Sequence, residues 1–202
     1  VKDDRVMRSH TGRRRNEQAR RAILDAAVDL LLRAELPDIS IERIATEAGV
    51  GRQTIYRWWP SKGAVLAEAM AERAEAAAPL PDTGTLAEDL RLFLRATFRT
   101  VGTEPAAGLL RALLAEAQRD PHAAAALEAF TAGRREQLRT LLERAAARGE
   151  VAAEADLAVL VEQLYGVLWY RLSITREALD DGLADRLAGA AVAQAAGSRS
   201  AG

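Results

Sequence analysis

The chain has 202 residues, 49% of them apolar, 28% charged and 4% aromatic, so it is long enough for one large domain or for a small and a medium domain. A composition rich in Ala, Leu and Arg favours helices over strands and excludes a mainly disordered chain. The lack of cysteine excludes disulfides, thiolate zinc sites and cysteine nucleophiles. The net charge of −1 is unevenly spread: residues 1–63 carry 13 Lys and Arg against 9 Asp and Glu, and the remainder carries 15 against 20.

The N-terminal segment begins with twelve polar or mixed residues, which we expect to form a flexible arm over 1–12. The arginine run at 13–15 follows this arm. Apolar residues then recur at three- and four-residue spacing from Ala19 to Ala34, and this period predicts a helix that ends before Pro37.

Two short helices, 41–48 and 52–59, are predicted next, joined by a tight turn. Ser40 is a good N-cap for the first helix, and Gly49 suits the left-handed position that ends it. Pro60 ends the second helix. Two short helices with this connection are typical of a helix-turn-helix, in which the second helix enters the major groove of DNA.

The second of these helices has two distinct faces. At about 100° per residue, Ile55 and Trp59 lie on one side, and we expect them to be buried. Gln53 and Arg57 then point directly away from the core. These outward groups can hydrogen-bond bases and phosphates, whereas a helix that only covers a core more often exposes Glu, Lys and Ala.

The segment 45–62, Ala-Thr-Glu-Ala-Gly-Val-Gly-Arg-Gln-Thr-Ile-Tyr-Arg-Trp-Trp-Pro-Ser-Lys, resembles the DNA-binding signature of the TetR family of regulators. The shared features are an Ala-Gly-Val turn, an Ile-Tyr pair, an aromatic core residue and a Ser-Lys start to the fourth helix. The resemblance covers about residues 16–66 and is weaker over the last 50 residues. It implies an N-terminal three-helix DNA-binding domain and a larger helical domain that binds a small effector and dimerises.

Within this resemblance, we expect base recognition by Arg52, Gln53 and Arg57, because Arg suits guanine and Gln suits adenine. We expect contacts to the DNA backbone from Ser40, Thr54, Tyr56, Trp58 and Lys62. The sequence departs from the family at two positions, where Gly51 replaces the usual Ser or Thr and Trp58 stands where His is common. Arg13, Arg14 and Arg15 are either a solvated run or a DNA-contacting arm.

The rest of the chain reads as further helices separated by breaks at 78–84, 102–105 and 149–155. A capping box, Thr85 with Glu88, opens the helix after the first break. The predicted fold is therefore all-α with about nine helices. The predicted domains are an arm at 1–12, a helix-turn-helix domain at 13–62, a connecting helix and loop at 63–84, an effector-binding and dimerisation domain at 85–196, and a tail at 197–202.

In the C-terminal domain, aromatic residues and polar residues within apolar runs are candidates for an effector pocket, although aromatic residues are more often core. The candidates are Phe93, Phe98, Gln118, Phe130, Gln163, Tyr165 and Trp169. The helix at 156–172 is apolar nearly all round, which indicates a partner subunit on one side unless it is buried within its own chain. The expected dimer contacts are Leu168, Leu183, Leu187 and Ala191.

The sequence thus predicts a cytoplasmic regulator that binds double-stranded DNA, most simply a homodimeric repressor released from a palindromic operator by a small-molecule effector. A constitutive DNA-binding regulator without a ligand is an alternative. An all-α enzyme is poorly supported, because there is no His pair, Ser-His arrangement or phosphate loop. We expect no cofactor and no metal site. Glu162, Gln163 and Arg171 interrupt the most apolar segment, which favours a buried helix over a membrane span.

Overall fold

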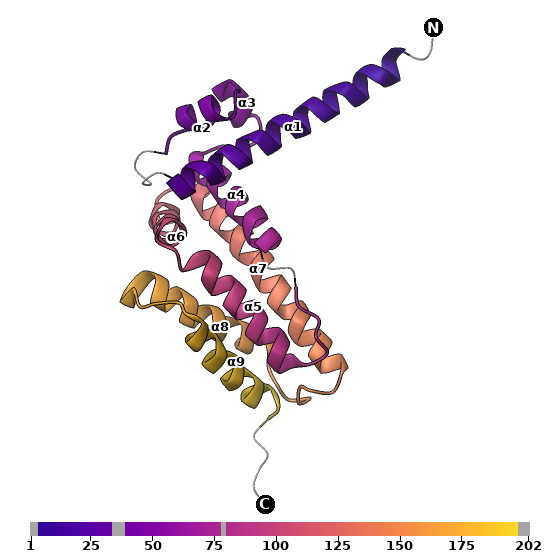
Figure 1. Cartoon of the computed structure of the whole chain (residues 1–202), viewed down its shortest axis with the longest axis vertical. Helices are drawn as coiled ribbons and strands as arrows, with labels where there is room; N and C mark the ends of the chain where they lie inside the picture. Colours follow the sequence, from indigo (N-terminus) through magenta and orange to yellow (C-terminus); the bar gives the residue numbers. More distant parts are fainter. Residues whose placement is uncertain (1–3, 34–38, 78–79, 198–202) are drawn as a thin grey trace, which may run out of the picture.

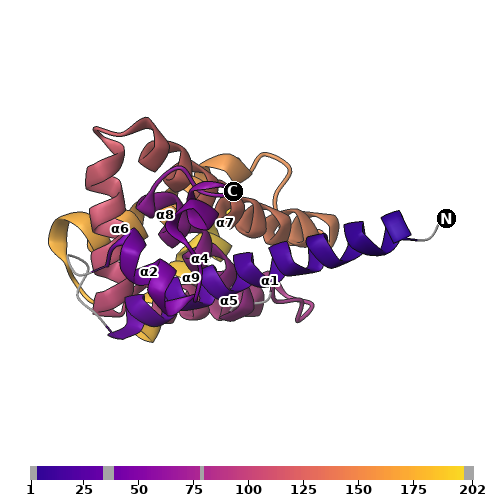
Figure 2. The same cartoon turned by 90° about the horizontal axis from the view of Figure 1, so that it is seen from above.

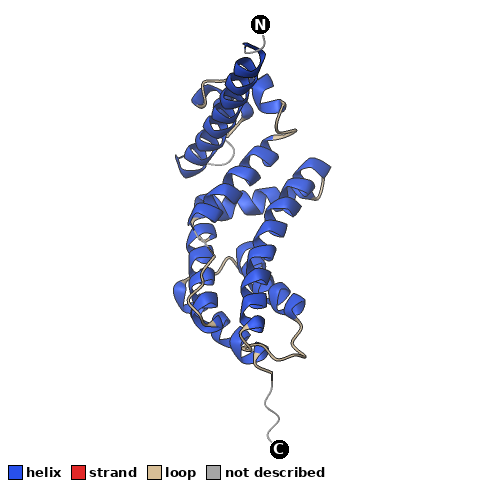
Figure 3. Cartoon of the chain, turned by 90° about the vertical axis from the view of Figure 1, so that its right-hand side faces the viewer, coloured by secondary structure: helices blue, strands red, loops and turns tan. Residues whose placement is uncertain are grey.

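The computed structural model describes residues 4–33, 39–77 and 80–197, and over these ranges the chain forms nine α-helices and one π-helical turn (Figures 1 and 3). The all-α prediction is confirmed. The elements are α1 (Asp4–Arg33), α2 (Ile41–Glu47), α3 (Arg52–Tyr56), α4 (Lys62–Ala77), α5 (Leu86–Val101), α6 (Glu104–Ala117), α7 (Pro121–Ala147), α8 (Leu157–Tyr170), η2 (Arg171–Thr175) and α9 (Asp181–Ala195).

The first three helices lie at one end of the molecule, where the N-terminal half of α1 projects beyond the other helices (Figures 1 and 2). Ile23 of α1, Ile44 of α2 and Ile55 of α3 are fully buried in their shared core. α1 begins at Asp4, so the helix extends through most of the segment predicted as a flexible arm. The apolar period used for the prediction starts only at Ala19, because helical turns that do not pack on a core need no apolar stripe.

The turn between α2 and α3 follows the predicted capping chemistry. The hydroxyl of Ser40 accepts a hydrogen bond from the Arg43 backbone N–H at 3.2 Å, and Gly49 has a φ of +65°. α3 ends at Tyr56, earlier than predicted, although the Trp59 N–H still donates to the Ile55 carbonyl at 3.0 Å. The ring of Pro60 disfavours the helical region for Trp59, the residue directly before it.

α4 follows the helix-turn-helix in the chain and packs against both α1 and α7, so it connects the N-terminal helices to the C-terminal helices (Figure 1). The larger C-terminal core lies among α5, α7, α8 and α9. Phe93 and Phe98 of α5 and Leu138 of α7 are almost completely buried there. Thr85 caps α5 as predicted, because its hydroxyl accepts from the Glu88 N–H at 3.4 Å.

The segment Leu157–Thr175, which comprises α8 and η2, is long and apolar enough to cross a membrane by length and composition alone. Leu160, Leu164, Leu168 and Leu172 are instead buried in the protein core, as in the core helix of a soluble protein. Only 28% of the segment is buried, however. One face of this apolar segment is therefore left uncovered in the single chain.

Candidate nucleic-acid interface and ligand pocket

α3 shows the two faces that its sequence predicts. Ile55 and Trp59 are 0% and 3% exposed, and they anchor α3 in the core. Arg52, Gln53 and Arg57 are all exposed. The three side chains predicted to recognise bases therefore lie on the accessible surface of one short helix.

Arg52 is held against the preceding helix by an ion pair. Its Nη1 donates to Oε1 of Glu42 on α2 at 2.9 Å, and this hydrogen bond is the main reason that the pKa of Glu42 is below its ordinary value. Both side chains are exposed, and an exposed ion pair is weak because water screens it. Arg52 can therefore exchange Glu42 for a base or a phosphate at little cost.

Two of the predicted backbone contacts lie at helix N-termini. Ser40 caps α2 and Lys62 begins α4, and both are half-buried where free backbone amides favour phosphate. Thr54 is half-buried within α3, and its N–H donates to the Gly51 carbonyl at 2.8 Å. Tyr56 is 55% exposed. Arg13, Arg14 and Arg15 belong to α1, but their side chains lie outside the described part of the structure.

Trp58 is half-buried, and its ring stacks on Trp59 with centroids 6.0 Å apart and an interplanar angle of 26°. Its indole N–H is buried and has no hydrogen-bond partner among the described residues. The N–H is therefore not presented to a phosphate in this conformation. The accessible part of Trp58 is its ring, not its hydrogen-bond donor.

Glu68 of α4 connects Trp59, which follows α3, to α1. It accepts a hydrogen bond from the Trp59 indole N–H at 2.6 Å and forms an ion pair with Arg20 of α1. Arg20 also contacts Glu72 at 3.0 Å. The position of α4 is thereby linked directly to the core that orients α3.

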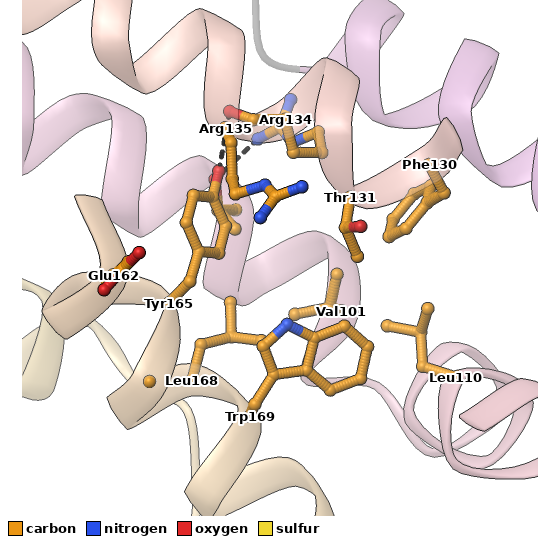
Figure 4. Close-up of a pocket in the computed structure, with 12 residues that line it drawn as sticks. Val101, Leu110, Phe130, Thr131, Arg134, Arg135, Glu162, Tyr165, Leu168 and Trp169 are labelled. Carbon is orange, nitrogen blue, oxygen red and sulfur yellow. Dashed lines mark hydrogen bonds between the residues drawn. The ribbon is translucent and has the colours of Figure 1, made fainter. Parts of the chain in front are cut away.

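A mostly apolar pocket of about 310 Å³ lies between α5, α6, α7 and α8 (Figure 4). Three of the predicted effector-pocket residues, Phe130, Tyr165 and Trp169, line it. The other lining residues are Thr97, Val101, Leu110, Thr131, Arg134, Arg135, Glu162, Gly166 and Leu168.

The other predicted pocket residues lie elsewhere. Phe93 and Phe98 belong to the core, at 1% and 0% exposure. Gln118 lines a neighbouring open groove that shares Thr131 and Trp169 with the pocket, and Gln163 is exposed on α8. The phenylalanines are core residues, and α5, which carries them, packs against both α7 and α9.

Sequence reasoning missed the arginine at the pocket wall. Arg134 of α7 is only 7% exposed, and its guanidinium donates to the Thr97 hydroxyl at 2.7 Å and the Gln137 side-chain carbonyl at 2.6 Å. No local signal distinguishes it, because Arg135 next to it is exposed and α7 carries several further arginines.

The hydroxyl of Tyr165 donates to the Arg134 backbone carbonyl at 2.9 Å, which ties α8 to α7 at the pocket (Figure 4). Burial raises the pKa of Tyr165 to about 12 despite the opposing effect of the Arg134 charge. The phenol is therefore neutral at any physiological pH.

The predicted dimer contacts lie mainly inside the chain. Leu168, Leu183 and Ala191 are 4–6% exposed in the C-terminal core, and Leu187 is half-buried beside them. Leu183, Leu187 and Ala191 recur every four residues along α9, and they mark the side of this helix that packs on α5.

Two family models match the chain. Residues 23–69 match "Bacterial regulatory proteins, tetR family", and residues 80–191 match "Tetracyclin repressor-like, C-terminal domain". The uncharacterised HTH-type transcriptional regulator YdeS of Bacillus subtilis is 36% identical over 183 residues, which cover 87% of this chain and 88% of YdeS. The HTH-type transcriptional regulator AqdR of Rhodococcus erythropolis is 28% identical over 162 residues, 79% of this chain and 78% of AqdR.

Solved structures agree with these matches. The TetR family transcription regulator SCO0332 superposes with a TM-score of 0.79 at 34% identity, covering 88% of this chain and 98% of that one. The regulator FadR of Bacillus subtilis, solved in complex with stearoyl-CoA, superposes with a TM-score of 0.63 at 19% identity, over 86% of this chain and 97% of FadR. The second likeness shows a shared fold.

Proposed function

Because this chain belongs to the TetR family of transcriptional regulators, which bind DNA through the helix-turn-helix and are not enzymes, we propose that it is a homodimeric repressor that a small molecule releases from a palindromic operator. It acts in the cytoplasm, where the DNA is. The ligand-responsive part of this proposal rests on the apolar pocket. One of the helices that line it, α6, also packs against the helix-turn-helix end of the molecule.

The exposed face of α3 supports sequence-specific binding. Gln53 and Arg57 point away from the buried Ile55, so they can reach base edges when α3 enters the major groove. In a two-fold dimer the two recognition helices would lie about 34–36 Å apart, on successive turns of the same groove.

The uncovered face of α8 supports dimerisation. Of the five large apolar side chains that are exposed in the described ranges, Val159, Tyr170 and Ile174 lie on α8 or η2. The outer face of α9 carries small exposed residues, Gly189, Ala190 and Ala193 among them, which allow another helix to approach closely. Pairing α8 and α9 with their copies would bury both faces in a four-helix interface.

α6 supplies a route from the pocket to the DNA-binding end. Leu110 lines the pocket, and Leu113, one turn later on α6, packs against the first turn of α4. That contact is tight, since a Cβ on Gly63 would lie 3.3 Å from Leu113 Cδ1. Gly63 follows Lys62 directly. A ligand that favours one position of α6 therefore shifts the population of α4 positions, and with them the separation of the recognition helices.

A matched pair of glycine substitutions tests this proposal. Gly166 lines the pocket and Gly133 does not, yet both are exposed helical glycines whose added Cβ would meet nothing within 4 Å. We expect Gly166→Leu to weaken release of fluorescent operator DNA by an active compound about tenfold or more, and Gly133→Leu to leave it unchanged. The readout is fluorescence anisotropy during compound titration.

The controls for this test are DNA affinity and oligomeric state without compound, which should both be the same in the two variants, because Gly166 shares an exposed face of α8 with Val159 and Tyr170. Operator binding that no compound of a broad library alters would contradict the ligand-released repressor and would support a constitutive regulator.

A further inference from the structure

Three polar or charged side chains are buried in the described part of the chain: Asp89, Thr97 and Arg134. Asp89 has the partners that a buried charge requires. It forms an ion pair with Arg148 at 3.3 Å and accepts hydrogen bonds from the backbone N–H and the hydroxyl of Thr83 at 2.7 and 2.8 Å.

Arg134 is buried without an opposite charge. Its hydrogen-bond partners, Thr97 and Gln137, are neutral, and its guanidinium lies over the Phe93 ring at 5.0 Å from the centroid. Within the described ranges no carboxylate lies within 4.0 Å of it. A guanidinium keeps its charge at physiological pH, so burial cannot be relieved by loss of a proton. The buried positive charge of Arg134 therefore has no compensating negative charge within the described ranges.

The same guanidinium lines the pocket described above. The charged side chains of this pocket carry more positive than negative charge. Arg134 and Arg135 contribute two positive charges, and Glu162, which is exposed on α8, contributes one negative charge. Tyr165 is neutral. Figure 4 shows both arginines on the α7 side of the pocket and Trp169 across from them on α8. The lining therefore offers a positive end and an apolar end.

We propose that the pocket binds a compact, mainly apolar molecule with one anionic group, and that Arg134 is the residue that binds this group. The apolar body lies against Phe130, Leu168 and Trp169. The volume of about 310 Å³ is at the small end of the range for ligand pockets, which favours a molecule no larger than two or three aromatic rings or a short chain. This inference rests on the proposed function, whose effector it assigns to a chemical class.

Two fluorescent dyes with the same aromatic skeleton test the charge requirement. 1-Anilinonaphthalene-8-sulfonate carries an anionic sulfonate, and N-phenyl-1-naphthylamine lacks it. The full-length protein should bind the sulfonate about tenfold more tightly, because a hydrogen-bonded ion pair in a mostly dry site is worth about that factor. Dye fluorescence in a protein titration measures both dissociation constants.

Variants locate the effect. Arg134→Gln should bring the affinity for the sulfonate down to that for the neutral dye and leave the neutral dye unaffected, and Arg134→Lys should keep part of the preference. Arg139→Gln is the matched control, since Arg139 is an exposed arginine of the same helix that pairs with Glu136 and Glu143. It should change neither constant.

The inference is overturned if the unmodified protein binds the two dyes equally or binds neither. This part of the test does not depend on whether any variant folds. The inference is also overturned if Arg134→Gln leaves the preference intact, since the sulfonate would then bind through Arg135 or at another surface. A different result would contradict the proposed function alone. The protein would then show the Arg134-dependent preference for the sulfonate dye, but its affinity for operator DNA would be the same with and without that dye.

Discussion

The helix-turn-helix and the C-terminal domain place arginine in opposite settings. Arg52 and Arg57 are exposed at the surface of a short helix, where their charge is available to a large polyanion. Arg134 is enclosed among α5, α7 and α8, where only a molecule small enough to enter the pocket can reach it. On the account proposed above, the chain uses the same side chain for two kinds of anion, and the accessibility of the guanidinium decides which anion can reach it.

The two regions also differ in how they are assembled. The proposed DNA-facing surface comes from the consecutive residues 40–62, whereas the pocket takes its lining from residues between Thr97 and Trp169 on four helices. A substitution on α3 should therefore act on DNA binding alone. Substitutions at the pocket should act on ligand response while leaving unliganded DNA binding in place.

The largest effect is expected at Arg57, the outward residue at the end of α3. We expect Arg57→Ala to cost about 1–3 kcal/mol at one base-pair position of the operator, because a bidentate contact to a base is lost. Affinities for a set of operators with single base changes would measure this. An equal loss on every operator would show that Arg57 contacts only phosphate and would weaken the proposed division between base and backbone contacts.

A smaller and more uniform effect is expected at Lys62, at the N-terminus of α4. Lys62→Ala should weaken binding to all DNA sequences similarly and reduce the slope of log affinity against log salt by about one. Salt titrations of operator and unrelated DNA provide the measurement. Tyr56→Phe should act in the same direction, and Arg139→Ala, on the exposed surface of α7, should change nothing. A loss confined to one sequence would contradict the backbone role.

The smallest effect concerns stability in the C-terminal domain. A hydrogen bond from the Leu86 N–H at 2.7 Å and another from Arg148 at 2.7 Å hold the pKa of Glu150 below its ordinary value. A lowered pKa stabilises the fold above the unfolded carboxyl pKa, and this stabilisation is lost as the pH falls through the folded value. Glu150→Gln should therefore lower Tm by about 1–3 °C at pH 7.

The pH profile is the sharper part of that prediction. The difference in Tm between the unmodified protein and Glu150→Gln should shrink as the pH falls below the ordinary range of a carboxyl group. Glu154→Gln, an exposed substitution nearby, serves as control. A difference that stayed constant down to pH 3 would mean that the side chain acts through packing and not through its charge.

Much of the helix-turn-helix could be predicted from the sequence because its geometry is local. Helical spacing alone placed Ile55 inside and Arg57 outside, and the caps at Ser40 and Gly49 were visible as residue types. The length of α1 was underestimated, since its first turns carry no apolar stripe. These predictions need no knowledge of what lies elsewhere in the chain.

The pocket was only partly predictable because it depends on which helices meet. Tyr165 and Trp169 were found as aromatics in an apolar run, but Arg134 looks like any other arginine of α7 until α5 covers it. For the same reason, the four-residue period of Leu183 and Ala191 could not distinguish contact with α5 from contact with a partner. Both uncertainties arise from long-range packing.

Selection of bound sequences from a pool of random double-stranded DNA tests the central claim most directly, since it examines recognition and symmetry together. The account predicts enrichment of one palindromic sequence whose half-sites are centred about one helical turn, or a multiple of it, apart. Arg57→Ala should relax a symmetry-related pair of positions in that sequence. Enrichment of no sequence, or of a single asymmetric half-site, would contradict a homodimer that recognises its operator through α3.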